Sequence, residues 1–208
     1  MESHIDIFHL IDIIGTFVFA LSGAIIGVKK NFDIFGVFVI SYVTAIGGGV
    51  MRDVCITNDV PVGLISNEYF VDVCLAVFSI LFLKKIVLSF EKSSLFFDAI
   101  GLGFFASFGA HKSYMLTGNI HLSIIMGCTT AIGGGIIRDI LTGKQPTIFT
   151  QELYASPAIL GAGIQLLGST GLMNIHVSGW LAIISCTLLR MLAIKYNIKL
   201  PPIRDIGF

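Results

Sequence analysis

Charged side chains are scarce in this sequence. Asp, Glu, Lys and Arg together make up 12% of the 208 residues, whereas hydrophobic residues make up 55%. A soluble domain carries about twice that share of charge. So little charge cannot cover the surface of a water-soluble protein, and we therefore expect an integral membrane protein. The length allows about six to eight helical spans and leaves no room for a soluble domain.

Motifs of known enzyme chemistry are missing as well. The sequence has no G-x-S-x-G, no H-E-x-x-H and no Walker loop, its five histidines are scattered, and its four cysteines stand singly, without a C-x-x-C pair. We therefore expect no catalytic residues, no bound metal and no cofactor. A net formal charge of zero gives no sign of nucleic-acid binding either.

Long uncharged or weakly charged runs fill most of the chain. The final run, 153–189, is too long to cross the membrane once, because a helix rises about 1.5 Å per residue and the apolar core is about 30 Å thick. The turn-rich segment Gly168–Gly171 divides it in two. The runs lack the alternation of barrel strands, and they predict an all-helical protein with seven membrane spans near 13–28, 34–51, 69–90, 93–110, 120–141, 154–172 and 178–196.

Basic residues are distributed unevenly between the two ends of these spans. With seven spans, eleven of the thirteen Lys and Arg residues fall on one side, and only Arg52 and Lys112 fall on the other. Cytoplasmic loops of membrane proteins are enriched in Lys and Arg. We therefore expect a multi-pass protein of the cell (inner) membrane, with the N-terminus outside and the C-terminus in the cytoplasm.

The first part of the sequence is repeated 86 residues later. Asp12 matches Asp98, the block Thr44–Gly49 is identical to Thr130–Gly135, and an Arg-Asp pair follows each block. Each copy holds three spans, so the second copy is inserted upside down, a plan typical of transport proteins. We divide the chain into a first three-helix repeat at 1–92, a second, inverted one at 93–175, and a seventh helix with a cytoplasmic tail at 176–208.

Each copy carries three consecutive glycines within a span. Glycine is unfavourable inside a helix, and irregular backbone in a membrane is tolerated where it lines a cavity or is buried in protein. We expect kinks at these triplets to line a permeation path, with two threonine hydroxyls nearby; close helix packing, and threonines bonded to their own helix, are the alternatives. The residues concerned are Thr44, Gly47, Gly48, Gly49, Thr130, Gly133, Gly134 and Gly135.

Ionisable residues at membrane depth are the other candidates for a gate. Arg52-Asp53 and Arg138-Asp139 follow the two triplets, and Lys112 ends the fourth predicted span. Anchoring at the interface is the structural alternative for all five residues.

Two further acidic residues open matching spans. We expect Asp12 and Asp98 to be charges at helix N-termini, where they offset the helix dipole.

These motifs resemble those of the prokaryotic trimeric intracellular cation (TRIC) channels. The resemblance covers about residues 6–192 and rests on five segments, namely Phe19–Ala24, Asp33–Gly36, Thr44–Asp53, Gly109–Lys112 and Thr130–Asp139. It implies a seven-helix protomer, a homotrimer in membrane lipid, and a pore in each protomer. It also implies conduction of monovalent cations, chiefly potassium, with gating at the kinked second and fifth helices.

Two points qualify what the resemblance implies. The same domain has been labelled a glycine transporter, so a secondary carrier of a small solute such as glycine is the alternative function. Animal members carry Lys-Glu-Val, which engages inositol lipid, where this chain has His111-Lys112-Ser113. We therefore do not expect that form of lipid regulation, and Lys112 stays a candidate pore or gating charge.

Overall fold

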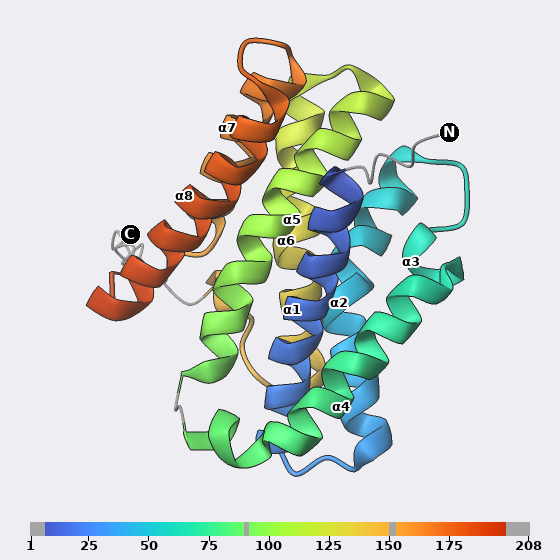
Figure 1. Cartoon of the computed structure of the whole chain (residues 1–208), viewed down its shortest axis with the longest axis vertical. Coiled ribbons are helices and arrows are strands. Elements are labelled where there is room, and N and C mark those ends of the chain that lie inside the picture. The colour runs from blue at the N-terminus through green and yellow to red at the C-terminus, as the bar shows by residue number, and fades with distance from the viewer. Residues whose placement is uncertain (1–6, 90–91, 150–152, 199–208) are drawn as a thin grey trace, which may run out of the picture.

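The chain folds into a bundle of long helices (Figure 1). The computed structural model describes residues 7–89, 92–149 and 153–198, without the side chains of 84–89. Within these ranges the structure is helical and contains no strand. The elements are α1 (Ile7–Lys29), α2 (Ile34–Ile56), α3 (Val62–Ile65), α4 (Asn67–Ser89), α5 (Ser93–Thr117), α6 (Ile120–Leu141), the 3₁₀ helix η1 (Thr147–Phe149), α7 (Ala155–Ser169) and α8 (Ile175–Tyr196).

Local sequence signals set where several helices begin and end. The Asp33 carboxylate accepts a hydrogen bond from the Gly36 amide at 2.7 Å, and Asn119 caps α6 in the same way. α5 continues past the predicted end of its span at residue 110 and stops only at Gly118, which takes a left-handed conformation with φ of 63°. Lys112 therefore lies inside a helix rather than beyond its end.

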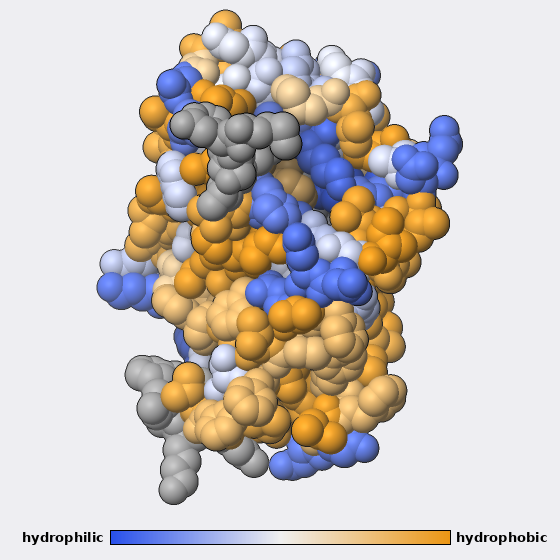
Figure 2. All heavy atoms as spheres, turned by 45° about the vertical axis from the view of Figure 1, so that its right-hand side comes forward, coloured by the Kyte–Doolittle hydropathy of each residue, from blue (hydrophilic) through white to orange (hydrophobic). Residues whose placement is uncertain are grey.

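Large apolar side chains cover the outside of the bundle. Phe35 is 71% exposed, Phe82 72% and Leu188 56%, and hydrophobic residues cover most of the face seen in Figure 2. Within the described residues, five helices are long and apolar enough to cross a membrane, namely α1, α2, α5, α6 and α8. An apolar exterior of this extent is suited to lipid rather than to water, so the chain is a multi-pass membrane protein.

The helices of the two sequence copies pack in matching ways. We call α1 to α4 the first copy and α5 to α7 the second. α1 packs against α2 and α4, α5 packs against α6 and α7, and α8 lies beside α5 and α7. The copies meet where α1 packs on α5 and α2 packs on α6.

Equivalent glycines allow the close approaches within each copy. A Cβ on Gly23 would lie 2.8 Å from the Thr44 hydroxyl oxygen, and a Cβ on Gly109 would lie 2.6 Å from that of Thr130. Both distances are too short for a real side chain. The first helix of each copy can therefore approach the second only with glycine at this position.

Candidate functional site

The two glycine triplets lie where α2 crosses α6. A Cβ on Gly48 would collide with the Thr130 carbonyl, and a Cβ on Gly134 would collide with the Thr44 carbonyl. The middle glycine of each triplet is therefore required for close packing of the two helices. Both helices run through their triplets without a break. The kinks expected from the sequence remain a prediction.

The first glycine of each triplet also lies against the opposite helix. A Cβ on Gly47 would approach the Ile137 side chain to 2.9 Å, and one on Gly133 would approach the Met51 sulfur to 2.8 Å. These contacts are with side-chain ends, which can move. The packing constraint is thus weaker here than at the middle glycines.

The two threonines before the triplets bond to their own helices. The Thr44 hydroxyl donates to the Ile40 carbonyl at 2.5 Å, and that of Thr130 donates to the Met126 carbonyl at 2.6 Å. Both side chains are buried. Each hydroxyl proton is therefore used within its own helix, which leaves the oxygen lone pairs as acceptors, and Thr130 borders the cavity described below.

A buried ion cluster follows the triplet in the first copy. The Arg52 guanidinium contacts Asp53 through Nε at 2.9 Å and Nη2 at 2.8 Å. Lys112 from α5 donates to both oxygens of the same carboxylate, at 3.1 and 3.3 Å. Both cations lie near the ring of Phe108, with the guanidinium carbon 5.2 Å from its centroid. The Asp53 carboxylate therefore holds two cations, and Lys112 ties the second copy to the first.

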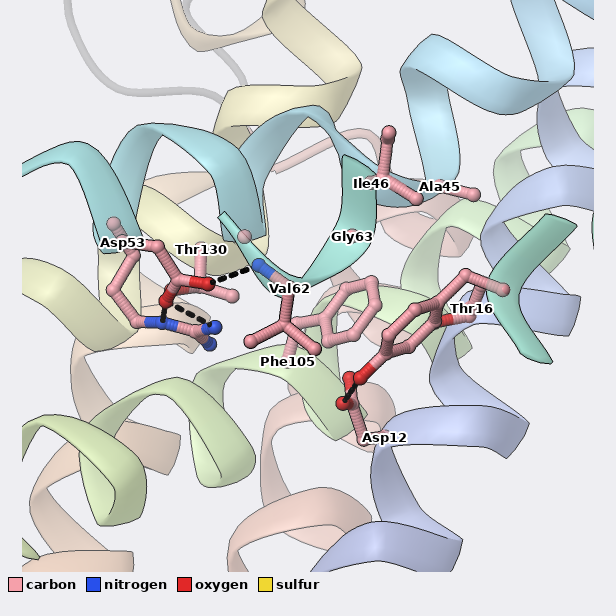
Figure 3. A pocket seen from close by; sticks show the side chains of 12 residues that line it. Asp12, Thr16, Ala45, Ile46, Asp53, Val62, Gly63, Phe105 and Thr130 are labelled. Carbon is pink, nitrogen blue, oxygen red and sulfur yellow. Dashed lines mark hydrogen bonds and ion pairs between the residues drawn. The ribbon is translucent and has the colours of Figure 1, made fainter. Parts of the chain in front are cut away.

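A small cavity lies next to this cluster (Figure 3). Asp12 and Arg52 both line it, and the Asp12 carboxylate accepts a hydrogen bond from the Tyr69 hydroxyl. The space open to the centre of a water molecule is about 20 Å³, enough for about one or two waters. The rest of the lining comes from Thr16, Ala45, Ile46, Gly49, Asp53, Val62, Gly63, Phe105 and Thr130.

The second copy has an equivalent ion cluster with different bonds. Arg138 contacts Asp139 through Nε at 3.0 Å, and its Nη1 contacts the Asp98 carboxylate at 2.5 Å. The same Nη1 donates to the Ser22 hydroxyl at 3.0 Å. Arg138 is 2% exposed and Asp98 1%. In the second copy, therefore, Asp98 and Arg138 form an ion pair, whereas the equivalent residues Asp12 and Arg52 of the first copy line a cavity.

The loop after each Arg-Asp pair returns to the second carboxylate. The Asp53 Oδ2 accepts the Val62 amide at 3.3 Å, and the Asp139 Oδ2 accepts the Thr147 amide at 3.1 Å. Each carboxylate therefore holds both an arginine and the short helix that follows. Arg52, Asp53, Arg138 and Asp139 are all buried, so none of them is an interfacial anchor.

The expected role of Asp12 and Asp98 was wrong. Asp12 is the sixth residue of α1 and Asp98 the sixth of α5, beyond the first turn where a helix dipole acts. Both side chains are buried and bonded to other helices. α1 starts earlier than expected because residues 7–11, which are apolar apart from His9, are already helical, and this moves Asp12 into the bundle.

The sequence reasoning also missed two tyrosines. Tyr69 bonds Asp12 in the first copy, and the Tyr154 hydroxyl lies beside Gly135, Arg138 and Asp98 in the second. A signal was present, because the repeat continues past the Arg-Asp pairs at a shift of 85. Pro61 and Tyr69 then match Pro146 and Tyr154. The second copy is one residue shorter between its Arg-Asp pair and its proline, so these matches are not seen at a shift of 86.

Comparison with known proteins identifies the family. Residues 9–85 and 95–170 each match the family model described as Glycine transporter, which is the domain of the TRIC proteins. The chain belongs to the TRIC family. This confirms the resemblance seen in the sequence. The inner membrane protein YadS of Escherichia coli (strain K12), a UPF0126 protein, is 32% identical over 198 residues, covering 92% of this chain and 93% of YadS.

Solved TRIC structures have the same fold. One, from a study of conductance through TRIC cation channels, is 35% identical with a TM-score of 0.84, covering 98% of this chain and 100% of that one. The TRIC orthologue of Rhodobacter sphaeroides is 29% identical, also with a TM-score of 0.84, covering 92% of this chain and 99% of that one. The TRIC fold is therefore shared along almost the whole chain.

Proposed function

We propose that the protein is a cation channel of the cell membrane with a water-containing path through each protomer. The observation that carries the proposal is the pair of buried, repeat-related ion clusters where α2 crosses α6, one of them beside a cavity. Buried ionisable groups in a membrane protein mark ion or substrate pathways. The related structures are described as TRIC cation channels.

The proposed topology has seven spans in two inverted repeats. The five helices that meet the length and hydropathy criteria are joined by α4 and α7. α7 has 15 residues and is about 22 Å long, which brings it across most of the apolar core. The family model matches the chain twice, 86 residues apart. This supports repeats at 1–92 and 93–175, followed by the seventh helix and tail at 176–208.

The proposed orientation places the N-terminus outside and the C-terminus in the cytoplasm. Arg52, Arg138 and Arg190 are buried in the bundle, so they do not count as loop charges. This leaves ten of the thirteen basic residues, and nine of those ten fall on the predicted cytoplasmic side. Without the three buried arginines, Lys112 is the single exception, and the bias is stronger.

The finer assignments follow the relatives. The Rhodobacter sphaeroides orthologue is described as a trimeric intracellular cation channel, which supports a homotrimer in membrane lipid and passage of monovalent cations, with potassium preferred. We assign gating to the crossing of α2 and α6. Its residues are Thr44, Gly47, Gly48, Gly49, Arg52, Asp53, Lys112, Thr130, Gly133, Gly134, Gly135, Arg138 and Asp139.

A secondary carrier of a small solute such as glycine is the second candidate. The description of the matching family model favours it. The size of the cavity argues against it, because about 20 Å³ of space accommodates one or two waters, whereas glycine has five heavy atoms. A carrier would have to open the site further in order to bind its substrate.

Single-channel recording distinguishes the two candidates. The purified protein is fused into a planar bilayer with asymmetric KCl. Discrete current steps that reverse near the potassium equilibrium potential support the channel. A silent bilayer, together with liposomes that take up labelled glycine in a saturable way, supports the carrier.

A matched pair of variants connects the current to the cavity. Gly49 borders the cavity, whereas Gly163 in α7 has open space where a Cβ would lie. Both are helical glycines, so valine changes the local helix propensity equally. Gly49→Val should block the current by filling the cavity, and Gly163→Val should leave it unchanged. Equal currents in the two variants would show that the ions do not pass through this cavity.

A further inference from the structure

The equivalent aspartates of the two copies are held by different partners. In the first copy the Tyr69 hydroxyl donates to Asp12. In the second copy the Arg138 guanidinium contacts Asp98 at 2.5 Å. Each aspartate is therefore held either by a tyrosine or by an arginine.

The partner not used in each copy is present and buried. Arg52 Nη1 is buried without a hydrogen-bond partner in the part of the chain that the structure describes, and the Tyr154 hydroxyl makes no hydrogen bond of good geometry there, although it lies close enough to Asp98 to interact with it. Arg52 is 3% exposed and lines the cavity together with Asp12, and the Tyr154 hydroxyl lies in the pocket of Asp98 and Arg138. Buried polar groups without partners are unfavourable. Each copy thus contains the kind of residue that holds the aspartate in the other copy, an arginine in the first and a tyrosine in the second.

The two tyrosines occupy equivalent places in the repeat. Tyr69 follows Pro61 by eight residues, and Tyr154 follows Pro146 by eight. Pro61 precedes α3 and Pro146 precedes η1, the two short helices that bond Asp53 and Asp139. Each copy therefore contains the same four residues, namely the aspartate of its first helix, the Arg-Asp pair and the tyrosine, and the two copies bond them in different arrangements.

The third glycines of the triplets show the same contrast in space. A Cβ on Gly49 would meet, among the described atoms, only Arg52 Nη2 within 4 Å, at 3.7 Å. A Cβ on Gly135 would meet the Tyr154 hydroxyl at 2.7 Å and Asp98 at 3.7 Å. The space beside the first glycine is open, and the equivalent space beside the second is filled.

We infer that Tyr69 and Tyr154 are gating residues that compete with Arg52 and Arg138 for the two aspartates. In a second state Arg52 binds Asp12 through Nη1 while it keeps Asp53, as Arg138 now binds both Asp98 and Asp139, and Tyr154 replaces Arg138 on Asp98. The cavity beside Gly49 then closes, and an equivalent cavity opens beside Gly135. This inference rests on the proposed pathway through the protomer.

The exchange keeps the two kinds of bond that the aspartates make. Each state contains one aspartate–arginine pair and one aspartate–tyrosine hydrogen bond. Two packings that share these bonds satisfy one condition for a two-state element; the Arg138–Ser22 and Lys112–Asp53 bonds have no counterpart in the other copy and favour the present state. A small bias from a ligand or a membrane potential could then move the population.

Two phenylalanine variants test the exchange because they act in opposite directions. Tyr69→Phe removes the hydrogen bond that stabilises the present state. Tyr154→Phe removes a hydroxyl that is used only in the second state. A hydrogen bond to a charged group is strong enough to shift such an equilibrium about tenfold or more.

Thiol labelling measures the populations without the need for ion current. Cysteine is placed at Ala45, which lines the cavity, and separately at the equivalent Ala131, in a background from which the four native cysteines are removed. A small thiosulfonate reagent reports how fast each site is reached in the full-length protein in liposomes. We expect Tyr69→Phe to slow labelling at Ala45→Cys and speed it at Ala131→Cys, each about tenfold, and Tyr154→Phe to do the reverse.

The double variant provides the control for folding. Because it lacks both hydroxyls, its two labelling rates should return toward those of the parent. Unchanged rates in both single variants, rates that move in the same direction at both cysteines, or a double variant that does not recover would overturn the exchange. A protein that carries no potassium current but shows opposed labelling shifts would refute the cation channel and keep the exchange. A protein that carries the current but shows no opposed shifts would keep the channel and refute the exchange.

Discussion

The two sequence copies agree in their backbone packing and differ in their polar bonds. Gly48 and Gly134 each touch a carbonyl of the opposite helix, so both crossings have the same geometry. Asp12 and Asp98, in contrast, bind a tyrosine and an arginine. Close backbone contact tolerates no residue larger than glycine, whereas a buried aspartate can bond to more than one kind of long side chain. The two copies thus share the backbone packing at the crossing, where only glycine fits, and differ in their side-chain bonds.

The two copies also differ in how well their ion clusters are sealed. The side chain of Lys112 is 24% exposed and reaches the Asp53 carboxylate from α5. The position in α1 that is equivalent to Lys112 is Ile26, which is apolar. The first cluster therefore includes a partly exposed cation, whereas Asp98, Arg138 and Asp139 in the second are all buried. This asymmetry is what the following variants are designed to test.

The largest expected effect separates the two aspartates. Asp98→Asn removes the charge that pairs with the buried Arg138 guanidinium, and we expect it to lower the free energy of unfolding by about 3 kcal/mol. Asp12→Asn still accepts the Tyr69 hydroxyl and should cost about 1 kcal/mol. Thermal unfolding in detergent measures both. Equal losses would mean that Asp12 and Asp98 are held in the same way.

Next in size are the middle glycines, which should behave alike. Gly48→Ala and Gly134→Ala both force a methyl group against a backbone carbonyl, and each should cost about 1 to 3 kcal/mol. Gly163→Ala is the control, because its Cβ meets no described atom within 4 Å and the helix gains up to about 1 kcal/mol. Unfolding midpoints in detergent compare the three. Tolerance of alanine at Gly48 alone would break the equivalence of the crossings.

The third glycines should respond differently to the same substitution. Gly135→Ala displaces the Tyr154 hydroxyl, so the gain in helix propensity of about 1 kcal/mol is cancelled. Gly49→Ala meets open space and should keep that gain. The difference is read as the gap between the two unfolding midpoints. No gap would show that the space beside Gly49 is filled in the membrane.

Lys112 should have the smallest effect on stability. Its ammonium group is partly exposed, and such ion pairs contribute about 0 to 1 kcal/mol. Lys112→Gln should therefore barely change the unfolding midpoint, while the open probability in single-channel records changes because Asp53 loses one of its two cations. A changed midpoint with unchanged gating would reduce Lys112 to a structural role.

Much of the architecture was predictable from the sequence because its signals are local. Uncharged or weakly charged runs predicted the positions of the long helices that the structure describes, and the identical glycine blocks predicted that α2 and α6 are equivalent. The ends of α1 and α5 were less predictable. No breaker precedes Asp12 within α1, and none ends α5 before Gly118, so hydropathy alone placed those ends too far inward.

The candidate site was only partly predictable. The Arg-Asp pairs and Lys112 were found from charge in apolar surroundings, and the structure places Arg52, Asp53 and Lys112 in one cluster. Tyr69 and Tyr154 were overlooked because the repeat shift changes from 86 to 85 after the Arg-Asp pairs, so that the two tyrosines do not align at the first shift. Their contacts with Asp12 and Asp98 join distant segments, which no local pattern records.

A helical membrane protein, its repeat and its family can be predicted from composition and from motifs that are read along the chain. The partner that holds each aspartate is known only from the packing of the helices. Asp12 and Asp98 have the same choice of a tyrosine and an arginine. A tyrosine hydroxyl and an arginine can each make a charge-assisted hydrogen bond to a carboxylate, so packing around each site, rather than residue type, selects between them.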